Sequence, residues 1–340
     1  MAGTNSSLDT RVGVVLFQLG GPDSLEAIEP FLYNLFCDPD IIDFPWARLA
    51  REPLARLISS QRAGKVRKHY QEIGGKSPIG EVTTRQMRAL EVELKKSFQA
   101  HVVVAMRYWH PMTEAAIREL LEFAPQEIVL LPLYPQYSST TTGSSLNEWQ
   151  RRFPRSATAT VHVVRKFYDH PLYLEALVER IEQGLARFRR SNGHATRAPS
   201  DVHLLFSAHS IPARVIERGD PYQAQIEATV EAVLKCGRWP NPHALCYQSR
   251  SGPGRWLQPL LPESLQNIAA DGTERVLVIP IAFVSDHVET LYEIDIEARE
   301  QAGYLGIQQF EVMEGLNDSP RFIAALADLV QSKVSARAPA

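Results

Sequence analysis

The stretch Val12–Leu19, VGVVLFQL, decides the fold class, because it is a strand-length apolar run without the alternation of a half-solvated strand. A strand that is apolar on both faces is covered on both faces, which is typical of parallel sheets. Three further runs share this character, IVLLPL at Ile128–Leu133, VHLLF at Val202–Phe206 and VLVIPI at Val276–Ile281. HVVVAM at His101–Met106 is a fifth candidate. We therefore predict an α/β protein built on parallel sheets.

The segments between these runs have the periodicity of amphipathic helices. We predict helices over Ser24–Phe36, Thr83–Phe98, Met112–Phe123, Pro171–Phe188 and Pro221–Leu234. Asp23, with Glu26 three residues later, predicts a capping box at the start of the first helix. Because strands alternate with helices, we expect helices on both faces of each sheet.

The two halves of the chain resemble each other weakly. EIVLLPLYPQYS at 127–138 and RVLVIPIAFVSD at 275–286 each run from a strand through a proline into a polar turn. Two similar α/β units would explain this likeness. The polar, breaker-rich segment Arg189–Ser200 is either the linker between such units or a surface loop within the second one.

Charge and composition exclude several classes of protein. The formal net charge is -3, whereas a nucleic-acid-binding protein carries a strong basic excess. The three cysteines are too few and odd in number for a disulfide framework, which favours a reducing compartment. The first residues are polar, unlike a secretory signal, and no window approaches the ~20 apolar residues that span a bilayer. We expect a cytoplasmic protein.

Polar residues follow the predicted strands, where ligands of open parallel sheets bind. His209 comes after one strand, and a histidine there either accepts protons, binds a metal or simply caps a helix. Glu289, Glu293 and Glu297 come after another strand at intervals of four, which on a helix places them on one face. With His287 before it, this row is either a path for protons or a hard cation, or a solvated acidic face.

Two further turns carry polar groups suited to a ligand with carboxylates. Arg107 offers a guanidinium fork and Tyr108 a flat aromatic face, although core packing explains Tyr108 equally well. The hydroxyl-rich segment after Tyr134 is either an anion-binding turn or a surface loop. No Walker A loop and no G-x-G-x-x-G fingerprint occur in the sequence, which disfavours nucleotide-dependent chemistry.

The segment at residues 23–57, called the lip here, is rich in Phe, Leu, Ile and Trp from Glu29 onward. Core packing accounts for many of these side chains. The rest suit a mobile apolar cover over a greasy ligand, or a surface that meets lipid.

Together these segments closely resemble the ferrochelatase family, from about Val12 to about Leu329. The likeness rests on LGGPDSLEAIEPFL, IGGKSPI, RYWHP, YPQYSSTTTGSS, FSAHSIPARVIERGDPY, CYQSRSGPGRWLQP and IPIAFVSDHVETLYEID, which occur in this order. The histidine segment and the S-D-H-x-E-T segment are the most specific of them.

The resemblance implies two Rossmann-like domains, each a parallel sheet flanked by helices, with a cleft between them as in chelatases. The N-terminal domain would cover residues 10–170, completed by a C-terminal helix at 318–335, and the C-terminal domain would cover 171–317. The implied activity is that of a lyase, which inserts Fe²⁺ into protoporphyrin IX and forms protohaem in haem biosynthesis.

The resemblance also implies roles for single residues. His209 would contact the centre of the macrocycle, with Glu289 as its acidic partner across the cleft, and both would be catalytic and bind the metal. A path for metal or protons would be formed by His287, Glu293 and Glu297. The porphyrin would be bound by Ser77, Arg107, Tyr108 and Tyr134. The lip matches the membrane-facing segment of membrane-associated relatives, so peripheral contact with the inner face of the cell membrane is compatible with a cytoplasmic location.

The cysteine content bears on whether the protein carries an iron–sulfur cluster. Relatives with a 2Fe–2S cluster hold it with four cysteines, but this chain has three, and none follows Cys246. We therefore expect no such cluster and no cofactor beyond the substrate Fe²⁺. Two alternatives stay open, a ferrochelatase that uses coproporphyrin III and a non-catalytic carrier of haem or another tetrapyrrole. A periplasmic solute-binding module is disfavoured by the missing signal sequence, and a sirohydrochlorin chelatase by the apolar lip.

Overall fold

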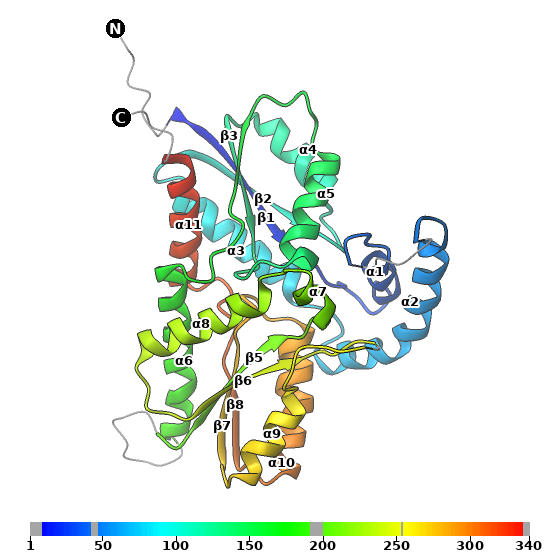
Figure 1. Cartoon of the computed structure of the whole chain (residues 1–340). Helices are drawn as coiled ribbons and strands as arrows, with labels where there is room; N and C mark the ends of the chain where they lie inside the picture. The colour runs from blue at the N-terminus through cyan, green and yellow to red at the C-terminus, as the bar shows by residue number, and fades with distance from the viewer. Residues whose placement is uncertain (1–8, 42–46, 191–199, 253, 336–340) are drawn as a thin grey trace. The chain divides into compact units, whose positions relative to one another are not determined.

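The computed structural model describes residues 9–41, 47–190, 200–252 and 254–335. The chain divides into two compact units, unit 1 with residues 1–167 and 317–340, and unit 2 with residues 168–316. Each unit contains one parallel four-stranded sheet with helices around it (Figure 1). The α/β class predicted from the apolar runs is confirmed. No described helix is both long enough and apolar enough to cross a membrane.

The sheet of unit 1 has the order β2-β1-β3-β4, and all its strand pairs are parallel. Its strands are β1 (Arg11–Gln18), β2 (Gln99–Met106), β3 (Glu127–Pro132) and β4 (Thr160–Val163). The first three follow the predicted runs. Strand β4 was missed because it is short and lies at the edge of the sheet, where no continuous apolar run is required.

Helices cover both faces of this sheet (Figure 1). The α-helices of unit 1 are α1 (Ile28–Phe36), α2 (Ala47–Glu72), α3 (Ile79–Leu94), α4 (Thr113–Phe123), α5 (Ser144–Arg152) and α11 (Pro320–Ser335). On one face, Leu120 of α4 and Trp149 of α5 pack against Val15 and Phe17. Helices α3 and α11 pack together on the other face, and Gln86 Nε2 of α3 donates to the carbonyl of Asn317 at 2.9 Å.

The beginning of α1 differs from the prediction. The helix begins at Ile28, and its N-cap Ala27 makes no side-chain cap bond, so the capping box at Asp23 was wrong. The Ser24 hydroxyl instead accepts from the Ala27 N–H at 3.3 Å, which forms a turn before the helix. Helix α2 was not predicted at all, because its polar, basic sequence has no clear apolar stripe and contains Pro53.

The sheet of unit 2 has the equivalent order β6-β5-β7-β8, again fully parallel. Its strands are β5 (His203–His209), β6 (His243–Gln248), β7 (Arg275–Pro280) and β8 (Gln309–Val312). Strands β3 and β7 hold the same place in the two sheets, and each is followed by a π-helix, η2 (Ser139–Gly143) or η3 (Glu289–Ala298). This shared topology accounts for the likeness between the two halves of the sequence.

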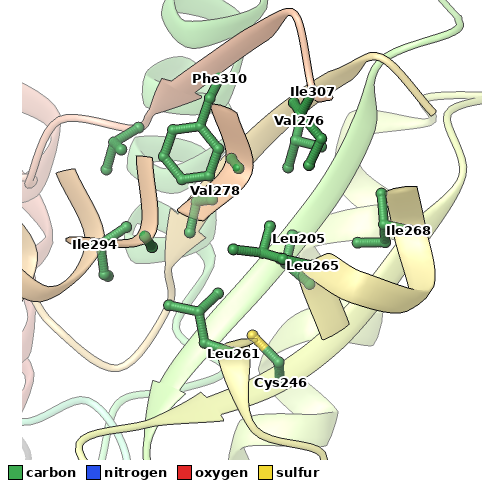
Figure 2. Packing of buried hydrophobic residues seen from close by; sticks show 13 residues of the cluster. Leu205, Cys246, Leu261, Leu265, Ile268, Val276, Val278, Ile294, Ile307 and Phe310 are labelled. Atoms are coloured by element: carbon green, nitrogen blue, oxygen red, sulfur yellow. The ribbon is translucent and has the colours of Figure 1, made fainter. Parts of the chain in front are cut away.

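The core of unit 2 lies between the sheet and the layer of α9, η3 and α10 (Figure 2). Leu205, Val276 and Val278 of the sheet meet Leu265 and Ile294 of this layer, and all five are fully buried. The α-helices of unit 2 are α6 (Pro171–Arg190), α7 (Ala213–Glu217), α8 (Tyr222–Gly237), α9 (Leu261–Ala270) and α10 (Arg299–Tyr304). Truncation of a buried leucine here would cost about 2–5 kcal/mol, so this core holds β5 and β7 rigidly.

The polar segment Arg189–Ser200 begins with the last two residues of α6 and continues toward β5, and both of these elements belong to unit 2. It is therefore not the linker between the two units. Residues 191–199 lie outside the described residues.

Candidate active site

A histidine and a carboxylate meet at the edge of the unit 2 sheet where its strands end. His209 is the last residue of β5, and Glu289 is the first residue of η3, which follows the neighbouring strand β7. His209 Nδ1 lies 2.8 Å from Glu289 Oε2. The expectation that Glu289 faces His209 across a cleft was wrong, because both residues belong to unit 2. Parallel neighbours end at the same edge of a sheet, which brings the two side chains together.

The imidazole of His209 is held but still accessible. Tyr222 Oη donates to the backbone carbonyl of His209 at 3.0 Å, and the Phe283 ring stands edge-on to the imidazole, with 6.5 Å between ring centroids. The side chain of His209 keeps 37% of its surface exposed, compared with 17% for Glu289. A fixed imidazole that still faces solvent suits a group that exchanges protons with a ligand.

Ser249 links two carboxylates of this cluster. Its hydroxyl lies 3.1 Å from Glu289 Oε2 and also hydrogen-bonds to Glu293 Oε2. A hydroxyl has one proton and cannot donate to two acceptors, so both contacts are satisfied when Glu293 is protonated and donates to Ser249. Ser249 follows β6 with φ of 63°, in the left-handed region. Sequence reasoning missed Ser249, although it lies in a quoted motif just after a strand.

The charges of the cluster push its pKa values apart. Burial raises the pKa of Glu289, but the charge and hydrogen bond of His209 outweigh burial and lower it to about 2. Burial lowers the pKa of His209, but the neighbouring Glu289 carboxylate outweighs this and raises it above the ordinary value. Burial, with the nearby charge of Glu289, raises the pKa of Glu293 to about 7. The site thus joins an ionised carboxylate to one that exchanges protons near neutrality.

His287 is a neutral member of the same cluster. Burial lowers its pKa, in spite of the nearby Glu289. Its Nδ1 lies 3.1 Å from the carbonyl of Ser285 and therefore donates a proton to it, which leaves Nε2 as the acceptor, 4.0 Å from Glu289 Oε2. Its ring also packs on Phe283, with 4.5 Å between centroids. His287 thus lies behind Glu289 in a fixed tautomer.

We expected the acidic row of Glu289, Glu293 and Glu297 to lie on an ordinary α-helix. The row lies instead on the π-helix η3. Because π-helical bonds run from i to i+5, residues four apart fall short of a full turn. Glu289 and Glu293 still meet at Ser249, while Glu297 is exposed. Within the described parts of the chain, no three His, Cys, Asp or Glu side chains form a group that could hold a metal ion.

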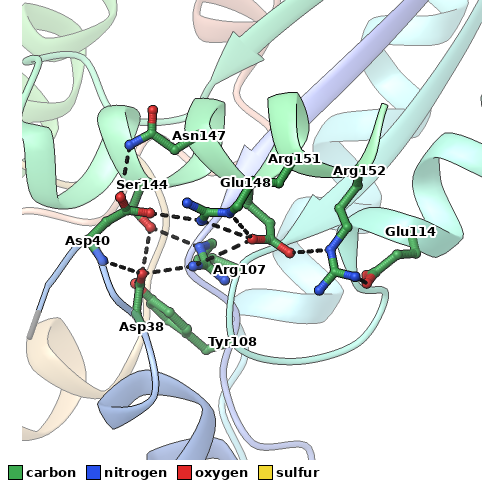
Figure 3. Close-up of polar contacts among 10 residues, drawn as sticks. All are labelled: Asp38, Asp40, Arg107, Tyr108, Glu114, Ser144, Asn147, Glu148, Arg151 and Arg152. Atoms are coloured by element: carbon green, nitrogen blue, oxygen red, sulfur yellow. Dashed lines mark hydrogen bonds and ion pairs between the residues drawn. The ribbon is translucent and has the colours of Figure 1, made fainter. Parts of the chain in front are cut away.

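The four residues predicted to bind porphyrin all belong to unit 1. Ser77 is buried, and its N–H donates to the carbonyl of Pro22 at 2.8 Å. Tyr134 is half-buried after β3, and burial raises its pKa. Tyr108 is fully buried, as the packing alternative has it, and its hydroxyl hydrogen-bonds to Asp38 (Figure 3). Arg107 pairs with Asp38 as well, and that these residues line a porphyrin site stays a prediction.

Comparison with known proteins places this geometry in a family. The family model described as Ferrochelatase matches residues 11–334. A ferrochelatase of Aquifex aeolicus is 46% identical over 329 residues, which cover 95% of this chain and 100% of that protein. Ferrochelatases of Synechocystis sp. and Geotalea daltonii are each 45% identical, over 96% of this chain and 83% and 98% of their own lengths.

Solved structures show the same fold at low sequence identity. CbiX, described as the terminal enzyme for biosynthesis of sirohaem in denitrifying bacteria, matches 97% of this chain and 100% of its own, with a TM-score of 0.50 and 14% identity. A multi-domain protein of Deinococcus radiodurans, described as structurally similar to chelatases, matches 95% of this chain and 54% of its own, with a TM-score of 0.53 and 13% identity. The fold of two Rossmann-like domains is confirmed, and the chain belongs to the ferrochelatase family.

Proposed function

We propose that protoporphyrin IX is the porphyrin into which this ferrochelatase inserts Fe²⁺, forming protohaem. A ferrochelatase is a lyase of haem biosynthesis, and its substrates are a porphyrin and ferrous iron. Relatives that are about 45% identical over nearly the whole chain support the activity. The observation that carries a mechanism is the 2.8 Å contact between His209 Nδ1 and Glu289 Oε2.

Insertion exchanges two protons for one metal ion. The free porphyrin carries two pyrrole N–H protons, and Fe²⁺ takes their place on the four ring nitrogens, which releases two H⁺. His209 is the proposed acceptor of these protons, because it is the accessible base of the cluster. Its neutral form is the active one, since an imidazolium cannot accept a proton. No nucleotide is required, because the metal–tetrapyrrole product is very stable.

The residues behind His209 form the proposed path for protons. Glu289 touches His209, the Ser249 hydroxyl joins Glu289 to Glu293, and Glu297 on the same π-helix is exposed. The cluster therefore runs from an accessible imidazole through half-buried carboxylates toward solvent. With its pKa of about 7, Glu293 both binds and releases protons at neutral pH.

His209 and Glu289 are also the proposed ligands of the incoming iron. An imidazole nitrogen and a carboxylate oxygen both suit a divalent iron substrate. Their mutual hydrogen bond occupies Nδ1 of His209, so Nε2 is the nitrogen that remains for the substrate. Neutral His287, 4.0 Å from Glu289, adds no positive charge that would repel the cation.

The lip supports a further proposal, peripheral contact with a membrane. On α2, Leu57 is 55% exposed and Leu54 is 36% exposed, on a helix rich in arginine and lysine. Exposed apolar side chains among cations suit a surface with anionic lipid. Residues 42–46 of the lip lie outside the described residues. Vesicle flotation with anionic lipid tests this contact, and Leu54→Ser with Leu57→Ser should reduce it.

An absorbance assay tests the proposed function. The protein is mixed under anaerobic conditions with Fe²⁺ and either protoporphyrin IX or coproporphyrin III, and loss of the free-porphyrin bands is followed. We expect faster turnover with protoporphyrin IX. Faster turnover with coproporphyrin III would overturn the substrate, and tight haem binding without any insertion would indicate a carrier. The spectrum of the purified protein tests the expectation that it carries no 2Fe–2S cluster.

A further inference from the structure

Asp38 is a buried carboxylate of unit 1 that the proposed mechanism does not use. Its side chain has no exposed surface, and the residue lies in the turn that follows the end of α1 at Phe36. Four groups donate to it: Arg107 Nη2 and the Asp40 backbone N–H at 2.8 Å, and the hydroxyls of Tyr108 and Ser144 at 2.5 Å. A buried carboxylate with this many donors is firmly held, and it neutralises the guanidinium beside it.

Arg107 is therefore not a free cation. Its Nη2 binds Asp38 and its Nε donates to Ser144 Oγ at 2.8 Å, while the side chain is only 12% exposed. Glu148 lies 4.0 Å from the same Nη2. The ten residues of Figure 3 include four carboxylates and three guanidinium groups, so the network has no excess positive charge. Arginines bind substrate carboxylates most strongly when no fixed carboxylate competes for them.

We propose that Asp38 determines porphyrin specificity by withholding the positive charge of Arg107 from the carboxylates of the substrate. This inference rests on the proposed function, because it takes Arg107 as a residue near the bound porphyrin. A site without a free guanidinium favours a porphyrin with two carboxylates over one with four. Asp38 is thus a positioning residue, which acts through Arg107 and not on the reacting atoms.

Tyr108 helps to hold the Asp38 carboxylate in place. Its hydroxyl donates to Asp38, and burial, with the Asp38 charge, raises the pKa of Tyr108 well above its ordinary value. It therefore keeps the proton that it donates throughout the working pH range. Asp38 draws together the chain after α1, the end of β2 and the start of α5.

The test compares Asp38→Asn with the wild type in steady-state assays with coproporphyrin III and protoporphyrin IX. Asparagine keeps the shape of the side chain but removes the counter-charge closest to Arg107, and leaves the more distant Glu148 at 4.0 Å. The ratio of kcat/KM for coproporphyrin III to that for protoporphyrin IX should rise roughly threefold or more, mainly through KM. Asp40→Asn is the matched control, because Asp40 binds Arg151 and Asn147 in the same network but does not touch Arg107. It should leave the ratio unchanged.

The double variant Asp38→Asn with Arg107→Gln removes the charge together with its neutralising partner, so the ratio should return to the wild-type value. If Asp38→Asn does not fold, Arg107→Gln alone is compared with the double variant. The uncompensated Asp38 should then lower the ratio. Equal loss of turnover on both porphyrins, with no change of the ratio in any variant, would overturn the inference. A wild type that inserts metal into neither porphyrin would overturn the proposed function instead.

Discussion

His209 Nδ1 lies 2.8 Å from Glu289 Oε2, although the two residues come from separate strand ends of the unit 2 sheet. This contact joins the accessible base of the site to an ionised carboxylate. The Glu289 charge raises the proton affinity of the imidazole and holds its ring through Nδ1.

Replacement of His209 by Ala should abolish most metal insertion. Removal of a general base costs about 10²-fold or more in kcat, while porphyrin binding measured by fluorescence should change little. Zn²⁺ insertion, followed by absorbance, gives the rate, and circular dichroism checks the fold. A folded His209→Ala protein with undiminished turnover would refute the role of proton acceptor.

Replacement of Glu289 by Gln should lower the pKa of His209. In the wild type the Glu289 carboxylate outweighs burial. After its removal burial is opposed by the smaller influence of the Glu293 charge, so the pKa of His209 should fall from its raised value. NMR titration of the imidazole C–H protons in the metal-free protein measures this directly. A His209 pKa that stays raised in the variant would show that Glu289 does not set it.

Replacement of Ser249 should separate a chemical effect from a backbone effect. Ser249→Gly and Ser249→Ala both remove the hydroxyl that joins Glu289 to Glu293, so both should slow insertion by about tenfold. Ser249 has φ of 63°, which glycine adopts freely, so the Ala variant should also be about 1 kcal/mol less stable than the Gly variant in urea unfolding. Equal insertion rates in Ser249→Gly and the wild type would contradict the proposed path.

Replacement of Glu293 by Gln should flatten the pH dependence of stability. The pKa of Glu293 is raised from 4.5 to about 7 in the folded protein. The folded state therefore binds more protons between these pH values, and stability falls as pH rises across this window, by at most about 3 kcal/mol. The raised pKa of His209 acts in the same direction above pH 6.5. Urea unfolding at pH 5 and pH 8 measures the loss.

Glu297→Gln is the control for Glu293→Gln, because Glu297 is exposed on the same π-helix. Its stability should keep the pH dependence of the wild type. If both variants keep that dependence, the half-buried carboxyl of Glu293 does not titrate as its surroundings indicate. The double variant Glu293→Gln with Glu297→Gln should insert metal more slowly but bind porphyrin nearly as well as the wild type. Equal loss of insertion and of porphyrin binding would indicate misfolding.

The apolar runs by themselves determined the class of the fold. Apart from Gln18, Val12–Leu19 and Val276–Ile281 contain no polar residue, and burial on both faces is a local property that the sequence records directly. The positions of His209 and Glu289 after their strands were likewise visible, because ligands of parallel sheets bind where strands end. The start of α1, the whole of α2 and the edge strands β4, β6 and β8 escaped prediction, because local capping and apolar patterns there are weak.

Only the tertiary structure decided which polar groups meet. Ser249 touches Glu289 and Glu293 because β6 and β7 flank β5, and nothing in local periodicity records that neighbourhood. The pairing of Asp38 with Arg107 has the same origin, since residues distant in sequence meet when α1 and β2 pack in one unit. Hydrophobic pattern depends on each residue's nearest neighbours along the chain, whereas pKa values and hydrogen bonds depend on distances that the packed sheet alone sets.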